Sequence, residues 1–245
     1  MCGRYVNVAA DADLVAEFDV EEVLDDAPGP SWNIAPTDPV RMIVRRTPKE
    51  AASAVRQLRT ARWGLVPSWS RDRKGGAKMI NARIETVTSK PAFKTAAAKR
   101  RCLLPALGYY EWQQTETGGK VPYFLHGADG GLLAFAGLYE LWRDRTLADD
   151  DPNRWLVTCT VITQQASDVL GEIHDRNPVV VPQSLWDGWL DCSSEDVAAA
   201  EALLAAIPEA HLEPYVVSAA VGNVRNNGPD LIKRATGPEA PQDLN

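Results

Sequence analysis

The feature that most constrains the fold is a close succession of short apolar segments in the second half of the chain. Each segment is only a few residues long, which favours β-strands over helices. The strands expected there are 102–107, 109–113, 123–125, 132–140, 155–163 and 179–181. Strands this short and this close together are typical of antiparallel sheets that close into a barrel or pack as two sheets.

The rest of the chain adds fewer strands and a few helices. Strands are expected at 4–8, 39–45, 56–66 and 215–218, helices at 13–18, 92–99 and 193–207, and loops at 28–36 and 67–76. The pattern predicts an α+β fold in a single domain, with mainly short antiparallel strands in a barrel-like or two-sheet core and a few peripheral helices. This domain should span 1–235, and the polar, Pro-containing stretch 236–245 should be a disordered tail.

Composition excludes several classes of protein. The 245 residues contain no apolar run of membrane-spanning length and no secretion signal at the N-terminus, so a cytoplasmic protein is expected. The four cysteines are widely spaced and form no CxxC pair, which argues against a zinc site and a disulfide framework. No phosphate-loop or dinucleotide motif occurs, so no metal and no cofactor are expected.

The charge is distributed unevenly along the chain. The net charge of the whole chain is −7. Residues 41–101 hold 17 Lys/Arg against three Asp/Glu, a balance of +14. The remainder holds 9 basic and 30 acidic residues, a balance of −21. This asymmetry indicates either a basic face that binds nucleic acid or a solvated basic surface without a partner.

Cys2 is the first candidate for chemistry. Removal of Met1 would expose its amine beside its thiol, and such a 1,2-aminothiol condenses with an aldehyde to a thiazolidine ring. The unperturbed pKa values, about 7.7–8.0 for an α-amine and about 8.5 for a thiol, leave useful fractions of both nucleophiles near neutral pH. The alternative is that Cys2 is a small buried hydrophobic residue.

Eight motifs surround this candidate in a fixed order. They are Met1-Cys2-Gly3-Arg4-Tyr5, Asn33-Ile34-Ala35-Pro36, Trp63-Gly64-Leu65-Val66-Pro67-Ser68-Trp69, Asn81-Ala82-Arg83-Ile84-Glu85-Thr86, Arg101-Cys102-Leu103-Leu104-Pro105, Gly108-Tyr109-Tyr110-Glu111-Trp112, Ala136-Gly137-Leu138-Tyr139-Glu140 and Ile173-His174-Asp175-Arg176. In this order they resemble the SOS-response-associated peptidase family, whose members process abasic sites in DNA. The resemblance runs from Cys2 to about Ile232.

The resemblance implies a catalytic group of four residues. Cys2 would be the nucleophile that forms a thiazolidine with the ring-opened abasic sugar. Asn81 would hold the Cys2 amine and the sugar through its amide. Glu111 would be a general acid and base, and His174 a second proton carrier near the aldehyde-derived hydroxyl.

The resemblance also implies contacts with single-stranded DNA that contains abasic sites, made by a protein that is expected to be monomeric. Arg4 and Arg83 would bind phosphates flanking the lesion, and Trp69 would stack on or wedge against a base. Asn33 and Pro36 of the second motif would also contact the strand. The function implied is an abasic-site sensor in the DNA damage response that shields the lesion by a covalent crosslink, with a lyase side reaction.

Each of these residues also has a structural interpretation. Asn81 could cap a turn, Glu111 could form a structural ion pair, and His174 could hydrogen-bond a loop. Trp63, Cys102 and Cys159 are expected in the core. One position departs from the family pattern, since Asn177 stands where an apolar Met is common, which puts fine substrate preference in doubt.

Two other functions remain open from the residues alone. One is a Cys-dependent peptidase built from the same four residues, whose action could be confined to the protein's own N-terminus. The other is a non-covalent single-strand binding module, which would bind intact and abasic strands equally.

Overall fold

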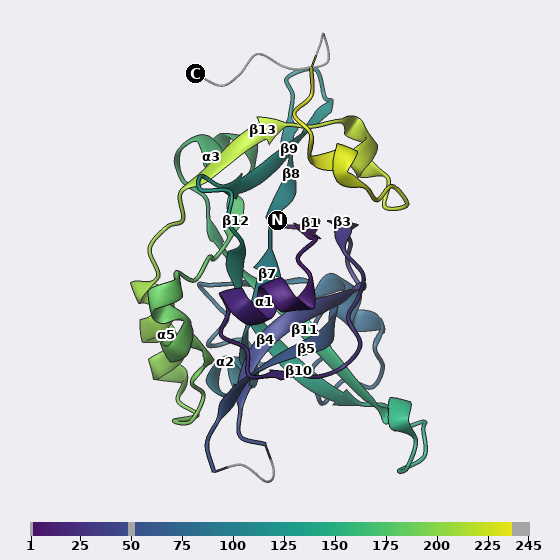
Figure 1. The fold of residues 1–245 in the computed structure, drawn as a ribbon, viewed down its shortest axis with the longest axis vertical. Coiled ribbons are helices and arrows are strands. Elements are labelled where there is room, and N and C mark those ends of the chain that lie inside the picture. The colour runs from purple at the N-terminus through teal and green to yellow at the C-terminus, as the bar shows by residue number, and fades with distance from the viewer. Residues whose placement is uncertain (1, 49–51, 237–245) are drawn as a thin grey trace.

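A closed β-barrel forms the body of the protein. The computed structural model describes residues 2–48 and 52–236. The barrel strands are β4 (Pro39–Arg46), β5 (Val55–Trp63), β7 (Arg101–Ala106), β10 (Leu133–Arg143) and β11 (Trp155–Gln165). They follow the order β11-β10-β7-β4-β5 as antiparallel neighbours, and a parallel pairing of β11 with β5 at Thr158↔Arg62 and Cys159↔Trp63 closes the ring (Figure 1). Three short strands extend this sheet: β2 (Glu22–Val23), β6 (Asn81–Arg83) and β12 (Arg176–Pro178).

A second antiparallel sheet stands on one end of the barrel. Its strands are β13 (Leu212–Val216), β9 (Lys120–Gly127), β8 (Gly108–Gln114), β1 (Tyr5–Asn7) and β3 (Ser31–Ile34), in that order. A single residue, Leu107, joins β7 of the barrel to β8, and its N–H donates to the Val6 carbonyl at 2.7 Å. The barrel and the second sheet are therefore continuous at the point where β1 lies.

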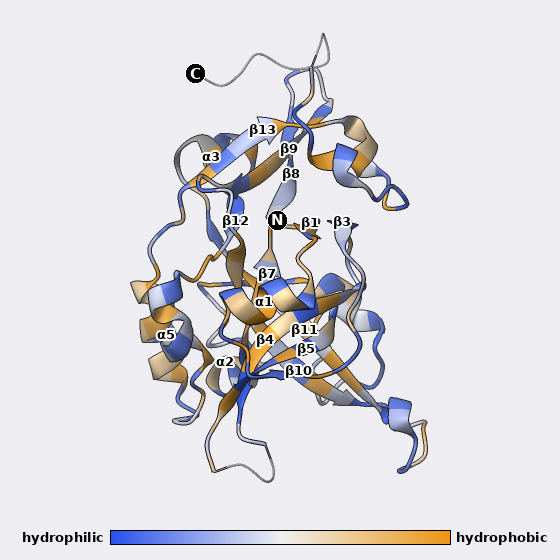
Figure 2. Cartoon of the chain, in the orientation of Figure 1, coloured by the Kyte–Doolittle hydropathy of each residue, from blue (hydrophilic) through white to orange (hydrophobic). Residues whose placement is uncertain are grey.

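The helices are short and lie outside the barrel. They are α1 (Asp11–Glu17), α2 (Lys94–Lys99), α3 (Asp168–Ile173), α4 (Trp186–Leu190) and α5 (Val197–Ala206), with single-turn segments η1 (Lys74–Lys78), η2 (Pro152–Arg154), η3 (Gln183–Leu185), η4 (Ala219–Gly222) and η5 (Pro229–Ile232). Hydropathy follows this arrangement, since the barrel strands are mostly apolar while hairpin tips and outer turns are hydrophilic (Figure 2). Within the described residues, no helix is both long and apolar enough to cross a membrane.

The core has an inner and an outer part. Inside the barrel, Tyr5 packs edge-to-face on Trp63, with ring centroids 5.1 Å apart, and on Phe135 at 6.0 Å. Outside it, Phe18 stacks on Trp186 at 4.5 Å. Aromatic pairs in these geometries contribute about 0.5–1.5 kcal/mol beyond the area they bury, so the Tyr5 contacts fix the first strand firmly.

Arg101 links the helices to the barrel although it is buried. Its guanidinium donates to the carbonyls of Trp189 at 2.7 Å and of Ala97 and Ala98, and also to that of Asp191. These acceptors lie in α2, in α4 and at its end, so one cation satisfies helix-terminal carbonyls that would otherwise lack partners.

The fold class predicted from the sequence is confirmed, and so is the predicted burial of Trp63, Cys102 and Cys159. Two details differ. Residues 31–34, within an expected loop, form β3 because they pair with β1. The strand expected at 179–181 is reduced to an isolated bridge between Val180 and Phe135, and the pairing strand is β12 just before it. Residues 237–245 of the predicted tail lie outside the described residues.

The approach of Gly64 to Gly76 gives a stability prediction. Gly64 has φ +126°, and a Cβ there would lie 2.6 Å from the Gly76 carbonyl oxygen. Gly118 has φ +86° but open space around it, so it is a matched control for the backbone conformation alone. Gly64→Ala should lower the free energy of unfolding by about 2–4 kcal/mol, and Gly118→Ala by about 1 kcal/mol. Urea unfolding measures both, and equal losses would contradict the close-approach argument.

Candidate active site

The N-terminal strand places Cys2 at the junction of barrel and second sheet. β1 lies between two neighbours, with Tyr5 paired to Tyr109 of β8 and to Ile34 of β3. Cys2 precedes this strand, is fully buried and belongs to the inner core. Burial raises the pKa of the Cys2 thiol well above its ordinary value, and the nearby Glu111 charge acts in the same direction. The thiol is therefore protonated near neutral pH, which corrects the expectation of a useful thiolate fraction.

Asn81 holds the backbone of Cys2. It starts β6, which is aligned by parallel pairing of Asn81 with Val161 of β11. The Asn81 Nδ2 donates to the Cys2 carbonyl oxygen at 2.7 Å. Its Oδ1 is buried and has no hydrogen-bond partner within the described part of the chain. An unsatisfied buried acceptor next to the Cys2 backbone can receive a donor such as an amine or a sugar hydroxyl.

Glu111 is the buried carboxyl of the site. It lies on β8 opposite Tyr123 of β9, and only 4% of its surface is exposed. Burial raises the pKa of Glu111 to about 7. Near neutral pH it is present in both protonation states, which suits a group that gives and takes protons.

His174 follows α3 and is half-buried. Its Nδ1 accepts a hydrogen bond from the Arg176 backbone N–H at 3.0 Å, and burial lowers the pKa of the ring. Asp175 Oδ1 lies 2.9 Å from the same nitrogen and opposes this shift, but 80% of the Asp175 side chain is exposed, so water weakens its effect. The lowered pKa favours the neutral imidazole near pH 7.

A bidentate ion pair connects the segments that carry Asn81 and His174. The Arg176 guanidinium donates to the Glu85 carboxylate at 2.6 and 3.0 Å and to the Thr163 carbonyl at 2.6 Å. This hydrogen bonding lowers the pKa of Glu85. Glu85 and Arg176 stood within sequence motifs but had no predicted role, and the structure shows that they fix the spacing of two candidate catalytic residues.

Electrostatic coupling links the predicted catalytic residues. The Glu111 charge acts on the Cys2 thiol, and Asp175 beside His174 acts on Glu111. Tyr109, a buried residue that sequence reasoning missed, is influenced by both Cys2 and Glu111. It stood in the same sequence motif as Glu111 but had no predicted role. The described residues contain no group of three or more His, Cys, Asp or Glu side chains placed to hold a metal ion.

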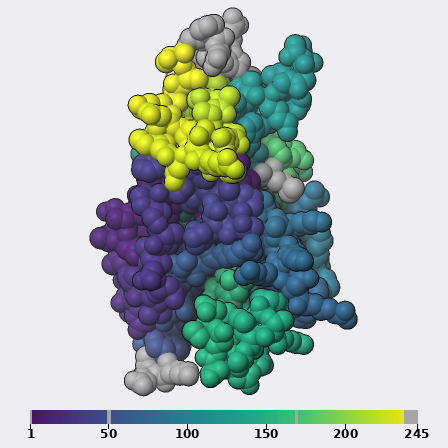
Figure 3. Space-filling model, turned by 90° about the vertical axis from the view of Figure 1, so that its right-hand side faces the viewer, coloured from purple at the N-terminus to yellow at the C-terminus, as the bar shows by residue number. Residues whose placement is uncertain are grey.

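The residues predicted to contact DNA fall into two groups. Trp69, with 65% of its surface exposed, Arg83 and the half-buried Pro36 are accessible. Arg4 and Asn33 hydrogen-bond the C-terminal segment, which lies over the N-terminal part of the chain in Figure 3. Arg4 Nη1 donates to Asn33 Oδ1 at 2.8 Å and to the Val221 carbonyl at 3.0 Å.

The side-chain amide of Asn33 is used in hydrogen bonds within the protein. Asn33 is buried, and its Nδ2 donates to the carbonyls of Val221, Asn223 and Asn226 at 3.3, 3.1 and 2.9 Å. With its amide so engaged, Asn33 supports Arg4 and the segment that follows β13. Asn177 is likewise buried in β12, and its Oδ1 has no partner among the residues described.

The basic stretch is partly neutralised by acids from elsewhere in the chain. Its ion pairs are Arg41–Asp11, Arg56–Asp19, Arg56–Asp187, Arg59–Asp25, Lys99–Glu195 and Arg100–Glu140. Within the described ranges no ion pair engages Arg62, Arg71, Arg73, Lys74, Lys78 or Arg83, which lie from the end of β5 through β6. One group of basic side chains without an ion pair therefore lies around the Trp69 loop and Arg83.

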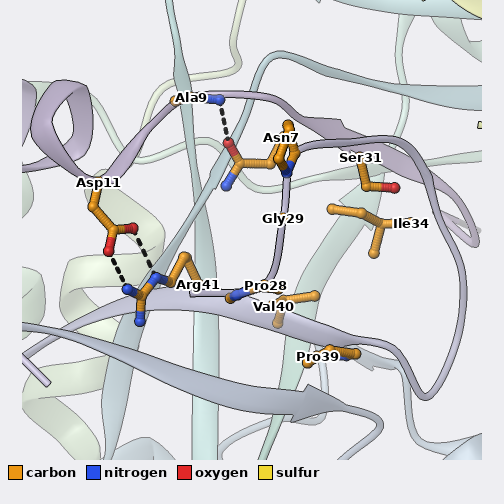
Figure 4. A pocket seen from close by; sticks show the side chains of 11 residues that line it. Asn7, Ala9, Asp11, Pro28, Gly29, Ser31, Ile34, Pro39, Val40 and Arg41 are labelled. Atoms are coloured by element: carbon orange, nitrogen blue, oxygen red, sulfur yellow. Dashed lines mark hydrogen bonds and ion pairs between the residues drawn. The ribbon is translucent and has the colours of Figure 1, made fainter. Parts of the chain in front are cut away.

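A cavity of about 30 Å³ beside residues 28–30 is separate from this site (Figure 4). It is lined by Asp11 and Arg41, whose Nε–Oδ1 hydrogen bond is 2.9 Å long. This volume suits about one water molecule.

Comparisons with known proteins identify a family, relatives and a shared fold. Residues 1–224 match the family model described as SOS response associated peptidase (SRAP). The chain is 34% identical over 234 residues to the abasic site processing protein YoqW of Bacillus subtilis (strain 168), covering 95% of this chain and 99% of that protein. It is 32% identical over 228 residues to the abasic site processing protein HMCES of Gallus gallus, covering 83% and 66%. A crystal structure of a protein from Bacteroides thetaiotaomicron has the same fold, with a TM-score of 0.75, 23% identity and coverage of 96% and 100%.

The raised pKa of Glu111 predicts a pH dependence of stability. Because the folded-state pKa of about 7 exceeds the unfolded value of about 4.3, the contribution of Glu111 to stability is present below about pH 4 and is lost as pH rises through 7. Glu111→Gln should remove this dependence. As the pH rises from 4 to 8, the free energy of unfolding of Glu111→Gln minus that of the wild type should increase by up to about 3 kcal/mol.

Denaturant unfolding across this pH range, with the exposed Glu172→Gln as control, measures the effect. Parallel curves for wild type and Glu111→Gln would show that Glu111 has an ordinary pKa.

Proposed function

The chain belongs to the SOS response associated peptidase family, and on this premise we propose that it processes abasic sites in single-stranded DNA by forming a covalent crosslink through Cys2. The observation that carries the proposal is the environment of Cys2. Its backbone is held by Asn81, and its buried thiol lies in the field of Glu111, whose pKa is raised to about 7. The relatives named above as abasic site processing proteins support the same substrate.

The proposed reaction is a condensation that releases one water. After removal of Met1, the Cys2 amine adds to the aldehyde of the ring-opened abasic sugar, and the resulting carbinolamine loses water to give an imine. The thiol sulfur then adds to the imine carbon and its proton ends on the nitrogen, which closes a thiazolidine. Asn81 Oδ1 is placed to accept from the amine, since it is buried without a partner among the described residues beside Cys2.

Proton transfer decides how fast this sequence runs. The thiol is protonated at neutral pH because burial raises its pKa, so its proton must be removed as the carbon–sulfur bond forms. Glu111, partly ionised near pH 7, is the base for that step, and in its protonated form it is the acid that helps water leave. His174, whose lowered pKa favours the neutral ring, is the second proton carrier and acts near the hydroxyl derived from the aldehyde.

Burial of the site favours a single strand as substrate. Cys2 is fully buried and Glu111 nearly so, hence the sugar must leave the stack to reach them. Extruding a nucleotide costs least when it is unpaired and lacks a base. Arg83 lies two residues after Asn81 on β6, on the same side of the strand, and would bind a phosphate next to the lesion. Trp69 would stack on a neighbouring base.

Crosslinking to an abasic oligonucleotide tests this function. On a denaturing gel the mature protein should form a shifted band, whereas Cys2→Ala should lose it entirely. A form that retains an N-terminal extension should also fail, because its amine is no longer beside the thiol. Normal crosslinking by the extended form would contradict the aminothiol mechanism. If wild type and Cys2→Ser both bound intact and abasic strands equally and without a covalent bond, a plain binding module would be favoured.

The same assay resolves the roles of the proton carriers. Glu111→Gln should slow crosslinking at pH 7 by about 10²–10⁴-fold and remove the inflection near pH 7 from the rate profile. Strand cleavage should become visible in this variant, because a longer-lived imine allows β-elimination. An unchanged profile would exclude Glu111 as the acid and base. Cleavage of a peptide in trans by the wild type would instead support the peptidase function.

A further inference from the structure

The barrel has a second open end, opposite the end that holds Cys2. Trp63, which contacts Tyr5 beside Cys2, ends β5, whereas Val55 at its other end pairs with Arg46 of β4. Nine strand residues separate these ends by about 25 Å. In Figure 1 this end is the lower one, where the hairpin between β4 and β5 emerges.

A cavity of about 380 Å³ lies at this end, and we call it the lower mouth. Side chains alternate along each strand, and Val44, Cys102 and Tyr139 belong to the inner core. The next inward positions are Arg46, Arg100 and Leu141, and all three line the cavity. Its wall is completed by the chain between α4 and α5, from Leu190 to Glu195. The mouths of β-barrels are common ligand sites, and this volume falls in the usual range for small molecules.

Positive charge predominates around the lower mouth. Its lining contains the cations Arg45, Arg46, Lys99 and Arg100 and the acids Asp191 and Glu195. Lys99 is paired with Glu195, and Arg100 with Glu140 at 2.9 Å. Arg45 and Arg46 form no ion pair with any residue that the structure describes. The charge of Arg45 also acts on the nearby Asp187 and Asp191 carboxylates, but four basic side chains against two acidic ones at one cavity favour an anionic ligand.

A buried donor in the lining supports the same conclusion. The Arg100 Nε is buried and has no acceptor among the residues that the structure describes. Such a donor is costly to leave without an acceptor, which a ligand oxygen in the cavity would supply. Tyr139, which is 4% exposed, also lines the cavity and carries a hydroxyl that can donate. The neighbouring Leu141 and Leu190 offer an apolar wall for a ring.

We propose that the lower mouth binds a phosphate-bearing ligand of about mononucleotide size, with the phosphate at Arg45 and Arg46 and its oxygens accepting from Tyr139. The phosphate comes either from a free nucleotide or from a nucleic-acid strand. This site is separate from the Cys2 chemistry and does not depend on it.

Calorimetric titration at low salt with inorganic phosphate, dAMP and a short intact oligonucleotide tests the proposal. Arg46→Ala should weaken binding about tenfold and Tyr139→Phe about fivefold. Arg145→Ala, an exposed arginine on the β10–β11 hairpin, is the matched control and should leave binding unchanged. Thermal unfolding of each variant confirms that it is folded.

The probes distinguish the sources. Tighter binding of dAMP assigns the site to a free nucleotide, and tighter binding of the oligonucleotide assigns it to a strand. Absence of binding by all three probes, or equal weakening by Arg46→Ala and Arg145→Ala, would overturn the proposal. Crosslinking to abasic DNA by Arg46→Ala is expected at the wild-type rate, so a failure of the Cys2 mechanism and a failure of this site are separate results.

Discussion

The insertion of β1 between β8 and β3 is the constraint on which the site depends. A strand that begins three residues after Cys2 is paired on both sides, and Tyr5 packs into the barrel against Trp63 and Phe135. Chain ends are commonly poorly ordered unless a sheet or a docking contact ties them down. Here pairing, aromatic packing and the hydrogen bond from Asn81 to the Cys2 carbonyl fix the first residues of the chain. The C-terminal segment adds a further clamp through Arg4 and Asn33.

Burial of this strand also sets the electrostatics. Desolvation favours neutral forms, so it raises the pKa values of Cys2 and Glu111 and lowers that of His174. The result is a thiol, a carboxyl near its midpoint and an imidazole that are mostly uncharged together near neutral pH. Carbonyl condensation needs several proton transfers but little net charge, and the proposed reaction suits such a site. The charge of the buried Arg176 is instead neutralised by Glu85, and this pair links the segments that carry Asn81 and His174.

Several elements were predictable because their own residues specify them. The long strands β10 and β11 are apolar along their length, and Trp63 and the inner cysteines are buried as expected. β3 and β6 were not predictable, because strands this short are stabilised by the partners they pair with rather than by their own pattern. The hydrogen bonds of Arg4 and Asn33 to the C-terminal segment were not predicted for a related reason, since their partners lie about two hundred residues away in the chain. The basic stretch similarly contains arginines whose acids come from distant segments, which composition alone does not reveal.

The central claim is that the α-amine and the thiol of Cys2 both bond to one carbon of the abasic sugar. Intact mass measurement of the purified adduct, followed by peptide mapping, tests it most directly. The account predicts a mass equal to that of the Met1-free protein plus the oligonucleotide less one water, formed without borohydride and located at Cys2. An adduct that survives only after borohydride reduction, or one located on a lysine, would contradict it.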